Sequence, residues 1–290
     1  MTYAVQMKDL AKHYRGFRLG GITMDVPAGC VTGIFGPNGA GKSTLVKLIA
    51  RHMAPTSGSL TVFGQRYEDS ERELRRRVTF VAEEPPFYPD KTVGWTGRFL
   101  ADFYEDWDQR RFSDLLHESR IDADREIKHL SRGQKTLFAL AAAFAHGADL
   151  LVLDEPVNGL DVLHRRDVLR RIREFVSDDG KAAVVSSHVT DALGDIADHV
   201  AFLREGRLAL CEERDALLSR WKLVHFRKGA LPQDVAGALL RVEEHALGCS
   251  GYTDDFAALR DRLEPLIASG AVRVENAGLD GVLVALVRGN

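Results

Sequence analysis

The feature that most constrains the fold is a glycine-rich segment between an apolar run at residues 31–35 and a stretch of helical periodicity. Four residues separate two glycines, and a lysine and a hydroxyl residue follow, in the order Gly36, Pro37, Asn38, Gly39, Ala40, Gly41, Lys42, Ser43 and Thr44. Such a loop can curl so that its backbone N–H groups point into one concavity, and the helix adds the positive end of its dipole. The segment predicts a triphosphate site, with Lys42 reaching the β- and γ-phosphates and Ser43 on Mg²⁺. The alternative is a glycine-rich turn that only begins a helix.

A second candidate group follows residues 150–153, an apolar run without polar alternation, as expected for a strand covered on both faces. The run ends in Asp154 and Glu155, which places two carboxylates at the carboxyl edge of a sheet, where ligands of open α/β folds bind. Asp154 is then positioned to hold Mg²⁺, and Glu155 to orient an attacking water or accept its proton. Taken alone, Asp-Glu-Pro after a strand also fits an ordinary turn.

Three shorter motifs complete the candidate set. Residues 130–134 are Leu-Ser-Arg-Gly-Gln, so Ser131 can cap an alanine-rich helix whose first N–H groups suit an anion. His188 follows an apolar run at residues 182–186, and Asp161 precedes another helical stretch. Each has a structural alternative: a capped helix, a histidine in a turn, and a helix N-cap.

The order and spacing of these motifs resemble the ATP-binding-cassette (ABC) ATPase family over about residues 3–215. The resemblance implies an α/β P-loop NTPase fold with a RecA-like core, an antiparallel β layer and a helical subdomain at about residues 90–145. It also implies that two cassettes face head to tail. Each ATP would then lie between the glycine-rich loop of one cassette and Ser131, Gly133 and Gln134 of the other.

The same resemblance implies roles for individual residues. Tyr14 falls where the family stacks an aromatic ring on adenine, although a tyrosine at a strand end is the alternative. Glu155 matches the catalytic glutamate, and His188 matches the switch histidine that contacts the γ-phosphate. Asp161 matches a residue that communicates across the dimer, and Lys42 completes the catalytic set.

Two positions depart from the family pattern. Glu83 stands where the family usually has a glutamine that senses Mg²⁺ and the transmembrane partner. A carboxylate can accept a hydrogen bond from metal-bound water but cannot donate one. We therefore keep Glu83 as a candidate metal residue beside Ser43 and Asp154. Arg132 stands where the family commonly has the first glycine of its motif, and the arginine side chain can point away from a ligand.

Hydrophobic periodicity divides the chain into two parts. Mixed strands and helices predict an α/β cassette over residues 1–220, with a half-exposed antiparallel layer near the N-terminus. From residue 221 onward, a short strand at 223–226 and an amphipathic helix at 254–269 predict a small α+β accessory subdomain over 221–290. Apolar strands are expected at residues 31–35, 78–82, 150–153, 182–186 and 199–203. Helices are expected at residues 42–52, 95–104, 108–120, 132–146, 162–177 and 212–220.

Composition limits the partners that the chain needs. The 39 basic and 42 acidic residues give a net charge of −3, so no nucleic-acid partner is expected. Three cysteines without paired spacing suit a reducing compartment. No secretory signal is expected, because residues 1–10 lack a basic start followed by an apolar stretch. No run reaches the roughly 18 apolar residues of a spanning helix. A transporter ATPase without a membrane-spanning segment implies a separate membrane subunit.

We therefore expect an ATPase subunit that binds ATP and Mg²⁺ at the cytoplasmic face of the cell membrane. It would pair with a second cassette and with a transmembrane permease docked around residues 83–90. The tail at residues 277–287 resembles that of ABC-2 type exporter ATPases and favours export. The alternative is a soluble ABC ATPase that acts as a regulatory module or associates with nucleic acid or ribosomes.

Overall fold

The centre of the molecule is a six-stranded sheet in the order β5-β6-β7-β3-β8-β9. The first five strands are parallel, and β9 is antiparallel to β8. The strands are β5 Val78–Val81, β6 Leu150–Asp154, β7 Ala182–Ser187, β3 Val31–Phe35, β8 His199–Arg204 and β9 Arg207–Glu213. Every residue of β3 and β6 is buried, so the prediction of strands covered on both faces is confirmed. The computed structural model describes residues 2–178, 180–246 and 248–287.

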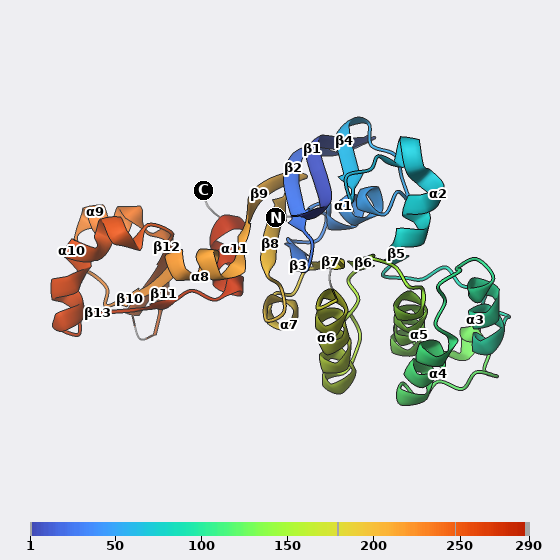
Figure 1. The fold of residues 1–290 in the computed structure, drawn as a ribbon. Helices are drawn as coiled ribbons and strands as arrows, with labels where there is room; N and C mark the ends of the chain where they lie inside the picture. Colours follow the sequence, from blue (N-terminus) through green and yellow to red (C-terminus); the bar gives the residue numbers. More distant parts are fainter. Residues whose placement is uncertain (1, 179, 247, 288–290) are drawn as a thin grey trace.

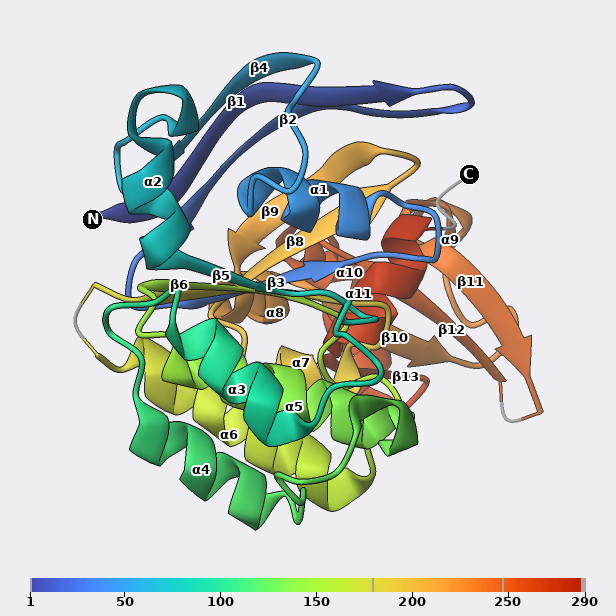
Figure 2. The same ribbon diagram turned by 90° about the vertical axis from the view of Figure 1, so that its right-hand side faces the viewer.

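A three-stranded antiparallel sheet lies above the central sheet, with helix α1 between the two (Figures 1 and 2). Its strands, in order, are β2 Phe17–Pro27, β1 Tyr3–Tyr14 and β4 Ser57–Val62, and the helix is α1 Lys42–Ile49. The buried face of this sheet and the apolar side of α1 form one core with the central sheet. The predicted N-terminal layer is therefore present. Strand β4 was missed because it begins with small polar residues that hide the period of two.

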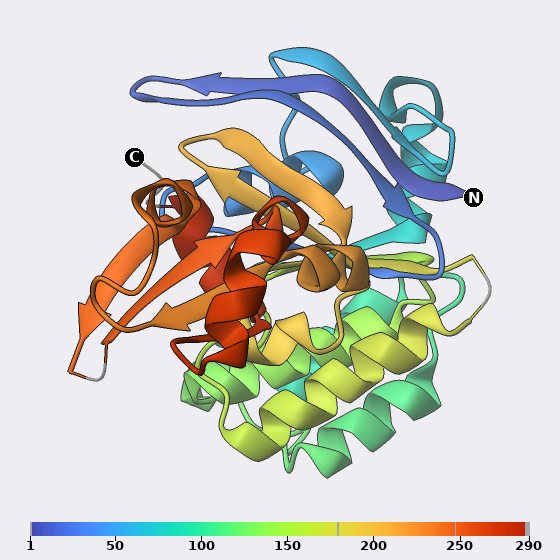
Figure 3. The same ribbon diagram turned by 90° about the vertical axis from the view of Figure 1, so that its left-hand side faces the viewer.

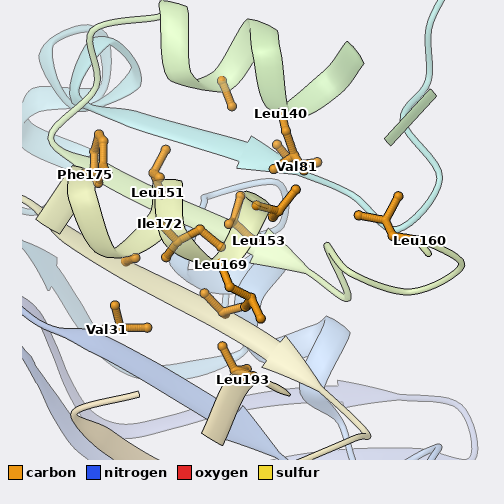
Figure 4. Close-up of a cluster of buried hydrophobic side chains, with 14 of the residues drawn as sticks. Val31, Val81, Leu140, Leu151, Leu153, Leu160, Leu169, Ile172, Phe175 and Leu193 are labelled. Carbon is orange, nitrogen blue, oxygen red and sulfur yellow. The ribbon is translucent and has the colours of Figure 1, made fainter. Parts of the chain in front are cut away.

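Helices cover the opposite face of the central sheet (Figure 1). They are α3 Val93–Ala101, α4 Gln109–Glu118, α5 Arg132–Ala145 and α6 Val162–Val176. Their apolar sides pack on the sheet in a second core, and Figure 4 shows Leu140 of α5 and Ile172 of α6 among the strand side chains. All four helices begin within two residues of the predicted positions, because their apolar periodicity is strong.

Four further elements connect these: α2 Tyr67–Arg77, the 3-10 turn Ile127–His129, α7 Asp191–Gly194 and α8 Arg214–Arg220. Helix α2 was not predicted from the sequence. Most of its residues are charged and only Tyr67 and Leu74 are buried, so it has no apolar stripe to recognise. It leads directly into β5 and fixes where that edge strand begins.

The C-terminal part forms a separate antiparallel sheet in the order β11-β12-β10-β13 (Figures 1 and 3). Its elements are β10 Lys222–Phe226, α9 Gln233–Ala238, β11 Leu240–His245, β12 Gly248–Thr253, α10 Phe256–Ala268, β13 Val272–Asn276 and α11 Leu279–Val287. The strand expected at 223–226 and the helix expected at 254–269 are both present. A small third core lies between this sheet and α9 and α10.

Helix α11 ties the C-terminal part to the rest of the chain. Leu279 and Val282 are buried in the same core as α6 and β8. The guanidinium of Arg204 donates to the carbonyl of Leu286 over 2.9 Å, and the hydroxyl of Thr190 donates to the carboxylate of Asp280. In the part of the chain that the structure describes, no helix combines the length and apolarity needed to cross a membrane.

Candidate active site

The glycine-rich loop curls between β3 and α1, as the sequence predicts. Gly36 has a φ of 153°, and a Cβ there would lie 2.3 Å from the carbonyl oxygen of Leu203 in β8, so a side chain has no room. Gly41 is the N-cap of α1 and has a φ of 104°, which favours glycine. Pro37, Asn38 and Gly39 are exposed at the tip. The loop therefore opens to solvent, with a helix N-terminus behind it that no side chain caps.

Lys42 lies under this loop with only 6% of its surface exposed. Its Nζ donates to the carbonyl oxygens of Gly36 and Pro37 over 2.9 and 3.3 Å. The same Nζ lies 3.5 Å from Oε1 of Glu155. The ammonium is thus held between the phosphate loop and one of the two predicted carboxylates.

Asp154 ends β6 and is buried, with 3% of its surface exposed. Its Oδ1 accepts hydrogen bonds from the hydroxyls of Ser43 over 3.1 Å and Ser186 over 2.6 Å. The backbone N–H of Glu155 in turn donates to Oγ of Ser186 over 3.1 Å. The Asp154 carboxylate is therefore joined to Ser43, at the start of α1, and through Ser186 to the backbone of Glu155.

Ser186 is the site residue that the sequence analysis missed. It is the second-last residue of the apolar strand β7 and lies directly opposite Asp154 in the parallel register. A usable signal existed, because two serines at the end of an otherwise apolar buried strand mark its carboxyl edge. Without knowing that β7 neighbours β6, nothing in the sequence assigns Ser186 to Asp154.

Glu155 follows β6 with a φ of 50°, uncommon for a residue with a side chain, and is 7% exposed. Its Oε2 lies 2.9 Å from Nδ1 of His188 and accepts from the backbone N–H of His188 over 3.3 Å. The carboxylate therefore lies between the ammonium of Lys42 on one oxygen and the imidazole of His188 on the other. This arrangement can hold a general base next to bound phosphates.

The oxygens near the loop fit a hard divalent cation. Oγ of Ser43 and Oδ1 of Asp154 lie 3.1 Å apart. Two neighbouring ligands of an octahedral Mg²⁺ lie about 3 Å apart, because each is about 2.1 Å from the ion. Ser43 and Asp154 could therefore share one Mg²⁺ with phosphate oxygens and water. No group of three or more His, Cys, Asp or Glu side chains that could hold a metal is found among the described residues.

Tyr14 lies at the end of β1, at the β1–β2 turn, with 43% of its surface exposed. Its hydroxyl contacts Sδ of Met53 over 2.9 Å. The aromatic ring beside the phosphate loop is instead that of Phe17: a Cβ on Gly41 would lie 3.0 Å from Cζ of Phe17. Phe17 is a second aromatic candidate that the sequence analysis did not single out.

Glu83 contacts residues other than the candidate metal ligands. Its Oε1 accepts from Nη2 of Arg132 over 2.9 Å and from Nδ2 of Asn158 over 3.1 Å. Among the described residues, no hydrogen bond joins it to Ser43 or Asp154. The two positions that depart from the family pattern thus contact one another.

The Ser131 motif lies at the start of α5, and Ser131 and Gln134 form a reciprocal capping box. Ser131 is exposed, and none of the hydrogen bonds of residues 131–134 within the described chain reaches the phosphate loop. Asp161 is the N-cap of α6 and accepts from the N–H groups of Leu163 and His164 over 3.0 Å each. Hydrogen bonding from His164, chiefly from its backbone, lowers the pKa of the Asp161 carboxyl. The predicted capping roles are therefore confirmed.

Comparison with known proteins agrees with this geometry. The family model described as "ABC transporter" matches residues 19–158. The chain is 31% identical over 212 residues to the uncharacterized ABC transporter ATP-binding protein YcbN of Bacillus subtilis, covering 72% of this chain and 69% of that one. It is 32% identical over 216 residues to the lantibiotic transport ATP-binding protein SrtF of Streptococcus pyogenes, covering 73% and 91%. A solved structure of an ATP-binding subunit of an ABC transporter superposes with a TM-score of 0.69 at 28% identity, covering 74% of this chain and 92% of that one.

The fold and the site together define a P-loop ATPase of the cassette type, with a glycine-rich loop, an acidic pair and a histidine at one edge of the sheet. The predicted fold class is confirmed. The chain belongs to the ABC transporter family as an ATP-binding protein.

Proposed function

We propose that this chain binds and hydrolyses ATP to energise a membrane exporter whose spanning part is a separate permease. One observation carries the proposal: Lys42 and His188 flank the buried Glu155 carboxylate beside the glycine-rich loop, and Ser186 joins the Glu155 backbone to the buried Asp154. Likeness to a lantibiotic transport protein supports transport. The resemblance of residues 277–287 to exporter tails supports export, and we place the protein at the cytoplasmic face of the membrane.

The residues of the site divide the work of hydrolysis. Backbone N–H groups of residues 36–44 and the ammonium of Lys42 would bind the phosphates, replacing the lysine's present contacts with loop carbonyls. Ser43 and Asp154 would hold Mg²⁺, which neutralises charge on the phosphoryl group. Glu155 would orient the attacking water and accept its proton, while His188 fixes the carboxylate and reaches the γ-phosphate.

A second cassette is needed to complete each site. Ser131 and Gly133 offer a helix N-terminus to solvent rather than to the loop of their own chain, and together with Gln134 we assign them to the ATP of the partner cassette. Val162 and Leu163, directly after Asp161, are 68% and 72% exposed. Large apolar side chains with this exposure are typical of an interaction surface. We propose Tyr14, together with Phe17, as the aromatic contact to adenine.

This chain has a groove that suits the docking of the permease. A cavity of about 410 Å³ lies between β5 and its following loop on one side and α3 and α5 on the other. Its lining is mostly apolar and aromatic, including Phe80, Pro86 and Leu100. Trp95 and Phe99 stack at a centroid distance of 5.1 Å on α3, which borders the groove. Because residues 84–88 form one wall, we keep the prediction of docking around 83–90.

We also retain the division into a cassette of residues 1–220, with a helical subdomain at about 90–145, and an accessory subdomain of residues 221–290. The separate core under α9 and α10 supports this division. The packing of α11 into the larger core explains how an accessory unit of this size stays attached.

The test uses two variants of the purified chain. Glu155→Gln should still bind ATP but hydrolyse it slowly, so that a dimer accumulates with ATP and Mg²⁺ on a sizing column. Lys42→Ala should lose ATP binding, whereas Lys47→Ala on the same helix should keep it. Dimerisation that is indifferent to ATP and to both substitutions would contradict the mechanism. Recovery of a multispanning subunit with tagged chain from membranes tests the transport role, and its absence favours the soluble alternative.

A further inference from the structure

Three segments that are far apart in the sequence meet at the carboxylate of Glu83. Glu83 follows β5, Arg132 is the first residue of α5, and Asn158 lies in the loop between β6 and α6. Both Arg132 and Asn158 donate to the same oxygen, Oε1 of Glu83, over 2.9 and 3.1 Å. A charged arginine donor makes the first of these hydrogen bonds the stronger one.

The surroundings of Arg132 hold its side chain on this path. A Cβ on Gly159 would lie 3.8 Å from Cδ of Arg132, so the arginine stem runs alongside the 158–160 loop. A Cβ on Gly133 would lie 3.5 Å from the carbonyl oxygen of Gly159. The start of α5 therefore packs on the loop that follows Glu155, and Arg132 reaches from there to Glu83.

Arg132 at this position is electrostatically unfavourable for α5 alone. A cation at a helix N-terminus opposes the helix dipole, whereas a carboxylate there is favourable. Glu83 supplies that carboxylate from the loop after β5. The ion pair offsets the unfavourable interaction of the Arg132 charge with the helix dipole and neutralises the charge of Glu83. The capping box of Ser131 and Gln134 provides acceptors for two backbone N–H groups at the start of α5. The Arg132 side chain carries only donors and bonds to Glu83.

We propose that Arg132 is a positioning residue that holds Glu83 against α5 and must release it before Glu83 can act on bound Mg²⁺–ATP. The inference rests on the proposed function and concerns the one candidate metal residue that lacks a contact with Ser43 or Asp154 among the described residues. Held by Arg132 and Asn158, the Glu83 carboxylate makes no hydrogen bond to Ser43 or Asp154 among the described residues, so it has to leave this position to reach metal-bound water there. Release of the pair links metal binding at the loop to the position of α5.

The pair is suited to such an exchange because it is weak. The side chains of Arg132 and Glu83 are 55% and 41% exposed. Exposed ion pairs contribute little net stability, since water solvates both charges after separation. A buried pair in this position would instead resist opening.

The experiment measures how ATP binding to the full chain depends on Mg²⁺, at a protein concentration where sedimentation shows a monomer. This condition keeps Arg132 away from the ATP of a second cassette. Arg132→Gln should lower the Mg²⁺ concentration at half-maximal ATP binding by about two- to fivefold, the range expected for freeing an exposed carboxylate. Arg132→Lys, which keeps the charge and a donor, should stay closer to wild type.

Glu83→Gln provides the decisive background. In the Glu83→Gln variant, Arg132→Gln should no longer lower the Mg²⁺ concentration at half-maximal ATP binding, because no carboxylate is left to release. If the Mg²⁺ midpoint does not move in Arg132→Gln, or moves equally in the Glu83→Gln background, Arg132 acts independently of Glu83 and the inference is overturned. Arg76→Gln, which breaks an exposed ion pair with Glu105, controls for the general loss of a positive charge.

A second readout does not involve nucleotide. The backbone amides of Glu84, Phe87 and Tyr88, which flank two prolines without an N–H, should exchange hydrogen faster in nucleotide-free Arg132→Gln and Glu83→Gln than in wild type, by similar factors. Unchanged exchange in both variants would overturn the positioning role even if Mg²⁺ midpoints differ. Failure of the proposed function is distinguishable, because a wild-type chain that binds no ATP contradicts that function, whereas normal binding with identical midpoints contradicts only the role of Arg132.

Discussion

Two ion pairs near the carboxyl edge of the central sheet differ in how the fold holds them. The side chains of Lys42 and Glu155 are 6% and 8% exposed, whereas those of Arg132 and Glu83 are 55% and 41% exposed. The first pair follows buried strands, so the backbone fixes its position. The second pair joins the start of α5 to the loop after β5 through side chains alone. The buried pair therefore suits chemistry that needs fixed geometry, and the exposed pair suits a contact that opens.

The largest effect is expected at the buried pair. Lys42→Met leaves the buried Glu155 carboxylate with His188 as its remaining partner, and removing one partner of a buried pair costs up to about 3 kcal/mol in such a setting. The free energy of unfolding of the nucleotide-free chain should fall by about that amount in urea denaturation. Adding Glu155→Gln to Lys42→Met should recover most of the loss, because the stranded charge is then gone. Equal stability of Lys42→Met and wild type would show that the pair is not truly desolvated.

His146 extends the comparison to a buried ionisable group that has no hydrogen-bond partner among the described residues. His146 is 3% exposed, and neither ring nitrogen has a hydrogen-bond partner among the described residues. Burial lowers the pKa of His146 to about 4, with Asp106 acting weakly in the opposite direction. The unfolded chain, with a pKa near 6.5, therefore binds more protons than the folded chain between about pH 6.5 and 4. Stability from this group is complete above pH 6.5 and is lost as the pH falls through that window.

The measurement is urea denaturation at pH 7, 6 and 5 for wild type and His146→Phe. The wild-type free energy of unfolding should fall by up to about 1.4 kcal/mol per pH unit more steeply than that of the variant. Phenylalanine keeps a ring against Tyr104, whose ring centroid lies 3.7 Å from that of His146. Carboxylates titrate in both proteins, so the difference isolates the histidine. Parallel slopes would mean that the pKa of His146 is the same in the folded and unfolded chains.

Two adjacent serines test the hydrogen bonds under the buried pair. Ser186→Ala removes the hydroxyl that donates to Asp154 and accepts from the N–H of Glu155. The free energy of unfolding should fall by about 1–2 kcal/mol, since a buried acceptor loses its donor. Ser187→Ala removes a hydroxyl whose hydrogen bonds, among the described residues, are both to Val189 in the same turn, and it should cost less. The same order is expected for ATP turnover, and a reversed order would contradict the network.

The same contrast explains what the sequence could predict. Residues 36–44, Asp154, Glu155 and His188 can be singled out as candidates because each follows a buried strand, and burial forces an apolar run that ends at the sheet edge. Most of the fold was found for the same reason. Strand β4 and helix α2 were missed because their small or charged residues carry no apolar period.

Contacts between elements that are distant in the sequence could be identified only from the structure. Ser186 could not be assigned to Asp154 without the strand order, and Glu83 could not be paired with Arg132 across 49 residues of chain. The sequence marked both Glu83 and Arg132 only as departures from a family pattern. Their contact depends on side-chain conformations at the surface, which no local periodicity encodes.

The smallest effect is expected at the exposed pair. Arg132→Gln and Glu83→Gln should each change the free energy of unfolding by less than about 1 kcal/mol, and their double-mutant coupling should be smaller still. Salt should weaken this coupling, because exposed charges are screened, whereas the coupling between Lys42 and Glu155 should resist salt. A large, salt-resistant coupling between Arg132 and Glu83 would remove the distinction between the two pairs. It would also make Arg132 a structural anchor of α5, since a pair that costly to open could not release Glu83 when Mg²⁺–ATP binds.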